Sequence, residues 1–298
     1  MEQAAKVLKR LPSQKQLQWT ELDAASPEDL YFLARQLVQC TLPHRDPGDV
    51  PLWTRTNGDL TLVVSRTAID ERSGKPIGYP FGSIPRLLLY WINSEAVRTK
   101  NPRLHLGNSL SAFLRELGLS PETGRGKRGD AFRLREQMRR LFSAAVRFQY
   151  TQLDDGRSRQ KLMPVVSDSE LWWSPRDPKQ DDLWFSWVEL GRDFFDAITQ
   201  SAVPLDTRVI REIKRSPLAL DLYAWLSYTS YSVTRKKTIR EVSWDQLHGQ
   251  MGTHYSNIHE FRRYALRSLR KIISIDPRFR IEPVDGRLRI NPASTLLT

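Results

Sequence analysis

The sequence predicts an α+β chain in which one succession of helices and strands occurs twice, about 130 residues apart. Segments with apolar residues at helical spacing are separated by short segments in which apolar and polar residues alternate. Two pairs of alternating segments enclose Asn57-Gly58 and Asp285-Gly286, dipeptides that favour the tight turn of a β-hairpin. With 298 residues, 40% of them hydrophobic, the chain has enough apolar side chains for about two cores.

The first 57 residues are expected to form a helical extension followed by a linker. Ser26 is a suitable N-cap, Pro27 fits the first turn of a helix, and the leucines that follow recur at helical spacing to about Cys40. Residues 41–51 are rich in Pro, Asp and Gly, which favour loops. A helix from Ser26 to Cys40 and a linker are therefore predicted before the repeated succession begins.

The two copies of the succession are assigned to residues 58–200 and 201–298. The first copy contains a helix from Ile84 to Val97, a strand in RLHL, a helix LSAFLREL capped by Asn108 or Ser109, a basic helix from Asp130, and strands RFQYTQ and QKLMPVV. The second contains the helix SPLALDLYAWLSYTS, the strand TIREV, a helix capped by Ser243, a basic helix from Asn257 and the hairpin RFRIEPVDGRLRI. This order predicts two tandem winged helix-turn-helix domains behind the extension. A chance succession of short elements in a mixed protein is the alternative.

The helix predicted from Asn257 carries an apolar stripe on one side and cations on the other. The stripe consists of Phe261, Ala265, Leu269 and Ile272. We expect DNA contacts from Asn257, His259, Arg263, Arg267, Arg270 and Lys271, and from Arg262, whose stem is expected to lie along the stripe. Only Glu260 interrupts this face, whereas a solvated face usually mixes both signs. An ordinary basic surface helix is the alternative. In the last hairpin, Arg287 and Arg289 are expected to touch the DNA backbone or the minor groove.

The basic helix of the first copy has the same design. Its expected core residues are Leu134, Met138 and Leu141, and its expected phosphate contacts are Arg133, Arg139 and Arg140. The preceding turn, residues 124–129, matches the spacing GxGxxG, but no apolar strand leads into it as a dinucleotide site requires. We therefore expect Arg125, Lys127 and Arg128 to hold phosphates of DNA instead.

Charge and composition favour a nucleic-acid-binding protein. The chain has 46 Lys and Arg against 34 Asp and Glu, with a net charge of +12 and a pI near 9.9. A single cysteine, Cys40, excludes an intramolecular disulfide and fits a reducing cytoplasm. Because the sequence has no apolar run of membrane-spanning length and no signal peptide, a membrane role is disfavoured.

No catalytic or metal-binding motif is expected to operate in this chain. The phosphate-binding pattern GxxxxGK followed by Ser or Thr does not occur. His248, His254 and His259 lie close in sequence, but no cysteine lies near them and their spacing is not that of a zinc site. We therefore expect no cofactor, no metal and no enzymatic activity.

Two long segments resemble the plasmid-encoded RepA replication initiators. They are LDTRVIREIKRSPLALDLYAWLSY, residues 205–228, and GYPFGSIPRLLLYWINSEAVRTKNPRLHLGNSLSAFLRELGL, residues 78–119, within a resemblance over roughly residues 58–292. The resemblance implies a protein that binds repeated sites (iterons) at a plasmid origin and its own promoter and helps to open the duplex. It further implies recruitment of the host initiator and the replicative helicase, with the sliding clamp as a further candidate partner.

The same resemblance implies a division of labour between the two units. The second unit would read bases through the helix from Asn257, and the first would contact the backbone and support dimerisation. A homodimer in equilibrium with the monomer is implied, with the dimer as autorepressor. Two other functions stay open: a winged-helix transcriptional repressor with no initiator role, and an initiator that nicks DNA with a metal ion.

Overall fold

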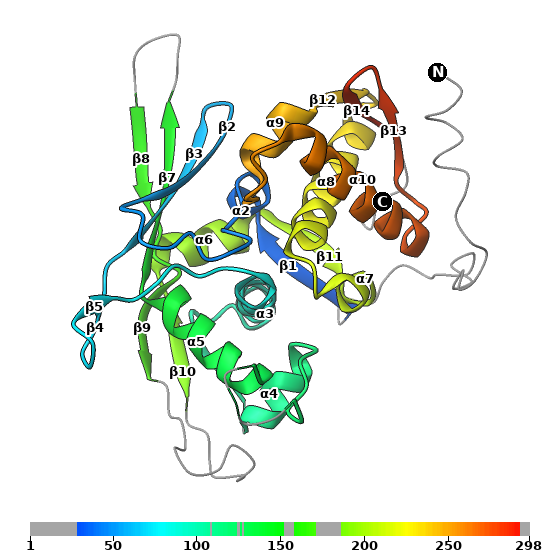
Figure 1. Cartoon of the computed structure of the whole chain (residues 1–298). Coiled ribbons are helices and arrows are strands. Elements are labelled where there is room, and N and C mark those ends of the chain that lie inside the picture. Colours follow the sequence, from blue (N-terminus) through cyan, green and yellow to red (C-terminus); the bar gives the residue numbers. More distant parts are fainter. Residues whose placement is uncertain are drawn as a thin grey trace.

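The structure is a computed structural model that describes residues 29–107, 109–123, 126, 128–151, 158–170 and 186–292. Helices and short antiparallel sheets follow one another along the chain, which confirms the predicted α+β class. The four-stranded sheet lies on one side of the molecule and helices α8–α10 (residues 217–275) on the other, with strand β1 and helix α2 (residues 30–39) between them (Figure 1). None of the helices within the described ranges is both long and apolar enough to cross a membrane.

The helix predicted from Ser26 to Cys40 is wrong. Residues Leu30–Ala34 form strand β1, and helix α2 is limited to Arg35–Gln39. Strand β1 pairs antiparallel with β11, Ala202–Asp206, far along the chain. This pairing with a distant strand overrides the local helix signal, whose cap at Ser26 lies outside the described residues.

The first copy of the repeated succession has the predicted helices. They are α3 (Ser83–Thr99), α4 (Leu110–Glu116) and α5 (Asp130–Phe142), with strand β6 (Arg103–His105) between the first two. The hydroxyl of Ser109 accepts a hydrogen bond from the Ala112 amide at 3.1 Å, which confirms the predicted cap. The predicted core residues of α5, Leu134, Met138 and Leu141, are fully buried.

The hairpin of this copy differs from the prediction. Strands β7 (Ala144–Thr151) and β8 (Ser158–Leu162) pair as expected, but they extend the predicted hairpin β2 (Trp53–Asn57) and β3 (Leu60–Arg66) into one sheet, in the order β2-β3-β7-β8. Strand β6 instead joins β10 (Trp187–Leu190) and β9 (Val166–Glu170). Leu62 and Val64 of β3 and Phe148 of β7 are buried, so apolar contacts stabilise this sheet. The alternation of apolar and polar residues shows which side chains face the core, but it does not show which strands pair with one another. The short pair β4 (Ile69–Asp70) and β5 (Lys75–Pro76) lies in the connection to α3.

The second copy follows the predicted order. The predicted elements are α8 (Pro217–Lys236), β12 (Arg240–Ser243), α9 (Trp244–Gln250), α10 (Ile258–Ile275), β13 (Arg280–Val284) and β14 (Arg287–Asn291). They are preceded by helix α6 (Arg192–Ser201) at the end of the first copy, and by β11 and helix α7 (Thr207–Ile213), which were not predicted. The last three strands form one sheet in the order β12-β14-β13. Ser243 caps α9 as predicted, because its hydroxyl accepts from the Gln246 amide at 3.1 Å. Asp285 and Gly286 both have positive φ, as the predicted tight turn requires.

Buried apolar side chains of both copies form one continuous cluster, rather than the two cores expected. The predicted linker is built into this structure. The amides of Thr41 and His44 donate to the carbonyl oxygens of Gln250 and Gly252, at 3.1 and 2.7 Å. Gly252 is required here, because a Cβ at this position would stand 1.6 Å from the Leu42 oxygen. Residues 41–44 therefore form a buried strap that runs between the two copies.

Candidate nucleic-acid interface

Helix α10 presents a cationic face opposite a buried stripe. The predicted stripe is confirmed, since Phe261, Ala265, Leu269 and Ile272 are all buried. The side chain of Arg263 is 71% exposed, and Arg267 and His259 are exposed as well. Oδ1 of Asn257 accepts from the His259 amide at 2.8 Å, so Asn257 caps the helix. The two exposed arginines are one helical turn apart and point away from the core.

The other cations of α10 are partly engaged with the protein. Cζ of Arg262 lies 5.7 Å from the centre of the Trp244 ring, which agrees with the predicted position beside the stripe. Nε of Arg270 is buried and has no hydrogen-bond partner among the described residues. Nζ of Lys271 donates to the carbonyl oxygen of Glu212 at 2.6 Å. Arg262 and Arg270 are thus half-buried, and Lys271 is exposed but hydrogen-bonded to the protein, so all three are less available to a ligand than Arg263 and Arg267.

The two arginines of the final hairpin differ in the same way. The side chain of Arg287 is 60% exposed, and its guanidinium lies 3.9 Å from the Glu241 carboxylate. Arg289 is closer to acids, at 2.8 Å from Glu241 and 3.3 Å from Glu282. Arg287 is therefore the hairpin cation better placed to meet a phosphate.

Two cations of α5 that were expected to bind phosphates form ion pairs with acidic residues of the protein. Arg139 pairs with Asp70 at 2.5 Å and with Glu136 at 3.5 Å. Arg140 pairs with Glu136 at 2.9 Å and with Asp46 at 2.7 Å, and its side chain is only 18% exposed. Because nearby carboxylates balance part of both charges, Arg139 and Arg140 are less available to a phosphate than an unpaired cation, and a DNA contact by either stays a prediction.

The remaining cations of this region are more accessible. The side chain of Arg133 is 53% exposed and pairs with Asp130 at 3.3 Å, a weak surface pair one turn away. Arg128 is exposed in the turn before α5. Arg125 and Lys127 lie outside the described residues, so their expected role stays a prediction.

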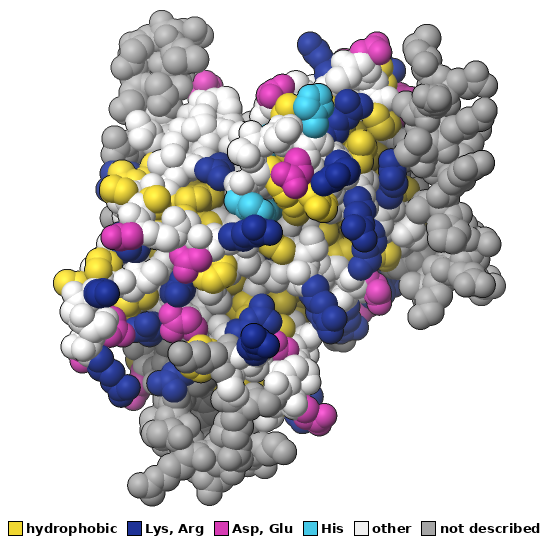
Figure 2. Space-filling model, in the orientation of Figure 1, with side chains coloured by type: hydrophobic (Ala, Val, Ile, Leu, Met, Phe, Trp, Pro, Cys, Tyr) yellow, Lys and Arg dark blue, Asp and Glu magenta, His cyan; other side chains and the backbone are white. Residues whose placement is uncertain are grey.

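A cation that the sequence analysis missed, Arg45, lies between the two helices. It lines one hollow with Arg133 of α5 and Arg215, and a second hollow with Glu260 and Tyr264 of α10. The two hollows therefore meet at Arg45 and join the faces of α5 and α10 into one surface. Lys and Arg side chains gather along α10 and continue toward α7 and α3 on this face (Figure 2). We call the exposed cations Arg45, Arg133, Arg215, Arg263 and Arg267 the basic face.

A buried cluster beneath the basic face holds the Arg45 segment in place. Arg86 donates to both carboxylate oxygens of Asp221, at 2.6 and 2.7 Å, and to the carbonyl oxygens of Leu42 and Gly82, at 2.6 and 2.7 Å. Nε2 of His44 lies 2.7 Å from the same carboxylate. The cluster thus ties the strap to α3 of the first copy and α8 of the second.

Burial and charge set the protonation of this cluster. Burial lowers the pKa of His44 to about 4, although its hydrogen bond to Asp221 acts in the opposite direction. Burial acts to raise the pKa of Asp221, but the charge of Arg86 and the hydrogen bond from His44 lower it to about 2. Near neutral pH the cluster therefore consists of a carboxylate, a guanidinium and a neutral imidazole.

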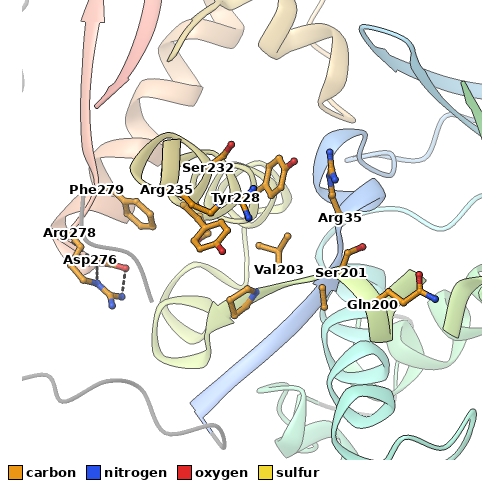
Figure 3. A pocket seen from close by; sticks show the side chains of 14 residues that line it. Arg35, Gln200, Ser201, Val203, Tyr228, Ser232, Arg235, Asp276, Arg278 and Phe279 are labelled. Carbon is orange, nitrogen blue, oxygen red and sulfur yellow. Dashed lines mark hydrogen bonds and ion pairs between the residues drawn. The ribbon is translucent and has the colours of Figure 1, made fainter. Parts of the chain in front are cut away.

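A separate cavity of about 360 Å³ lies beside the second half of α8 and shares no residue with the two hollows. Its wall carries Arg35 and Arg235, whose Cζ atoms lie 5.4 and 5.7 Å from the ring centres of Tyr228 and Tyr231 (Figure 3). The remaining charges, Asp276 and Arg278, pair with each other at 2.7 Å.

An exposed cationic helix face that continues across a groove to a second cation-bearing helix is typical of nucleic-acid-binding proteins. The sequence profile of the family described as "Plasmid encoded RepA protein" matches residues 79–246, which is more than half of the chain. The chain therefore belongs to the family of plasmid-encoded RepA replication initiators, and the resemblance noted from its two long segments is confirmed.

Among solved structures, a crystal structure of domains 2 and 3 of RctB is similar, with a TM-score of 0.45 and 10% sequence identity. The similarity covers 84% of this chain and 94% of that one. No curated protein matches the chain.

Proposed function

We propose that this RepA-family chain initiates plasmid replication by binding repeated double-stranded sites at the origin through two winged helix-turn-helix units. The single observation that carries the proposal is the cationic face of α10, where Arg263 and Arg267 are exposed opposite a fully buried stripe. The order of α8 to β14, with α10 after a short helix and before a hairpin, supports α10 as the recognition helix in the major groove.

The proposed contacts fall into two groups. Arg263 and Arg267 reach base edges or phosphates in the groove, and Arg287 touches the backbone beside it. Arg45 and Arg133 hold phosphates farther along the same duplex. Two recognition helices in successive major grooves have centres about 34–36 Å apart, so the proposed site is about two helical turns long.

The remaining parts of the proposal rest on the family alone. They are autorepression by a dimer at its own promoter, opening of the origin, and recruitment of the host initiator, the helicase and the sliding clamp. We propose that opening comes from bending of the DNA by several bound copies. We also propose that the protein does not cleave DNA, so that a supercoiled origin plasmid with Mg²⁺ keeps its superhelicity.

Charge removal on α10 tests the proposed DNA contacts. Arg267→Ala and Arg263→Ala are titrated against an origin fragment over a range of salt concentrations. The matched control is Arg98→Ala, which removes one charge from α3 outside the basic face. Each α10 variant is expected to lose about 1–3 kcal/mol of binding free energy, and loss of a phosphate contact lowers the salt slope by about one unit. Equal affinity in all three variants would contradict the proposed role of α10.

A further inference from the structure

Three aromatic rings form a stack at the beginning of α10, beside the exposed arginines. The ring centres of His254 and Tyr255 are 4.7 Å apart with the two rings tilted by 32°, and those of Tyr255 and Tyr264 are 5.1 Å apart with an interplanar angle of 13°. His254 is exposed, and the two tyrosines are half-buried. Burial and the nearby charge of Arg45 lower the pKa of His254. Near neutral pH this side chain therefore contributes an uncharged aromatic ring to the group. We call these three residues the aromatic stack.

The aromatic stack opens onto a hollow of about 350 Å³ between cations. Besides the three rings, the hollow is lined by Arg45, Ser256 and Glu260. Arg45 stands on the side toward α5, and on α10 the Cζ of Arg263 lies 5.0 Å from the ring centre of Tyr264. Aromatic rings with cations on both sides are the combination that binds single-stranded nucleic acid, in which phosphates meet the cations and bases stack on the rings.

Core packing accounts for only part of the arrangement of these rings, because Tyr255 and Tyr264 pack against the core and yet remain half-buried. Phe261 already fills the apolar position below them, fully buried, with its ring centre 6.4 Å from that of Tyr255. Tyr255 and Tyr264 lie above it on the solvent side and line the hollow. A duplex does not present base faces to such rings, because its bases stack on one another. Only an unpaired base offers a free face.

We propose that the aromatic stack binds an unpaired base of a strand separated beside the bound duplex, with Arg45 and Arg263 on the flanking phosphates. The inference rests on the proposed function, since it takes the basic face to be the DNA-binding surface. Through it, the protein that binds the duplex would also hold one separated strand, without any nucleotide to supply energy.

Glu260 gives this site a preference among bases. Its carboxylate lines the hollow and lies 3.8 Å from Arg263. An ionised carboxylate only accepts hydrogen bonds, and adenine, cytosine and guanine each offer an amino group. The single donor of an unpaired thymine, N3–H, stands between two carbonyl oxygens that a carboxylate repels. We therefore expect the site to favour amino-bearing bases, and Glu260→Gln to reduce this preference.

The test uses a single-stranded thymine 12-mer that carries one 2-aminopurine, whose fluorescence falls when it stacks. The full-length chain is compared with Tyr264→Leu and Tyr255→Leu, which keep an apolar side chain without a ring, and with Tyr264→Phe, which keeps the ring. Binding of each protein to the duplex origin fragment is measured in parallel. We expect quenching by the unchanged chain and by Tyr264→Phe, and a roughly ten- to hundredfold loss of single-strand affinity in the leucine variants.

The outcomes separate this inference from the proposed function. Duplex binding that survives in the leucine variants while quenching is lost supports the aromatic stack. Normal duplex binding by the unchanged chain with no quenching overturns the inference and leaves the proposed function intact. Equal losses of duplex and single-strand binding in the leucine variants also overturn it, because the rings then serve the duplex. Failure of the unchanged chain to bind the duplex overturns the proposed function itself.

Discussion

Replacing Arg86 with Met removes a buried cation that joins the two copies of the succession. The side chains of Arg86 and Asp221 are only 4% and 6% exposed, and Arg86 makes five hydrogen bonds, two to Asp221 and three to backbone carbonyl oxygens. In Arg86→Met the carboxylate of Asp221 stays buried with only His44 beside it. Removing one partner of a buried ion pair costs about 3–5 kcal/mol, so we expect the free energy of unfolding to fall by that amount.

The assay is urea unfolding followed by tryptophan fluorescence, with Arg98→Met as the matched control on the same helix. Arg98 pairs with Glu95 at 2.8 Å, but its side chain is 37% exposed, so its loss should cost about 1 kcal/mol or less. A natural domain has about 5–15 kcal/mol of stability in total, and the difference between the two variants is therefore easily measured. If Arg86→Met were no less stable than Arg98→Met, the cluster would not hold the two copies together.

Three further predictions concern the strap and α5. Gly252→Ala places a Cβ 1.6 Å from the Leu42 oxygen and should cost about 3 kcal/mol in urea unfolding, whereas Gly249→Ala, with its nearest atom at 3.8 Å, should not destabilise. The free energy of unfolding should fall as the pH drops from 6.5 toward 4, because His44 binds a proton in the unfolded chain but stays neutral when it is buried in the folded chain. Urea unfolding measured at a series of pH values should show a smaller fall in His44→Gln. Arg140→Ala should lose about 1.5–3 kcal/mol of stability and keep its affinity for DNA in the salt titration with the origin fragment. Unchanged stability with weaker DNA binding would instead show that Arg140 contacts DNA.

The elements best predicted from sequence are those whose signals are local. The stripe of α10 and the caps at Ser109 and Ser243 depend on residues within one or two turns, and the structure confirms all of them. The turn at Asp285-Gly286 is equally local, because the turn residues themselves must adopt positive φ.

The errors arise where a distant partner decides the structure. Strand β1 forms because it pairs with β11, and strand β6 pairs with β10 and not with the hairpin β7–β8, which is nearer in sequence. Arg45 was missed because it follows a segment that has the composition of a linker. That segment is held by the close approach of Gly252 and by the buried hydrogen bond of Asp221 to His44. Both residues are far from Arg45 in sequence, so no local pattern predicts these contacts.

For Arg139 and Arg140, helical spacing correctly indicated that they lie off the apolar stripe, but it could not show what lies there. Asp70 and Asp46 come from connections far from α5 in sequence, and their carboxylates form ion pairs with the two arginines. The cationic face of a single helix therefore indicates an anionic ligand only when the positions of the surrounding acidic side chains are also known.

The central claim is that the basic face binds repeated sites at the plasmid's own origin. The most direct measurement is a footprint of the unchanged chain on an origin fragment against random DNA of the same length, titrated over salt. Protection in regularly spaced blocks of about two helical turns, with a steep salt dependence, is the predicted result. Equal affinity for random DNA, or one protected operator at a promoter and none at the origin, would contradict it.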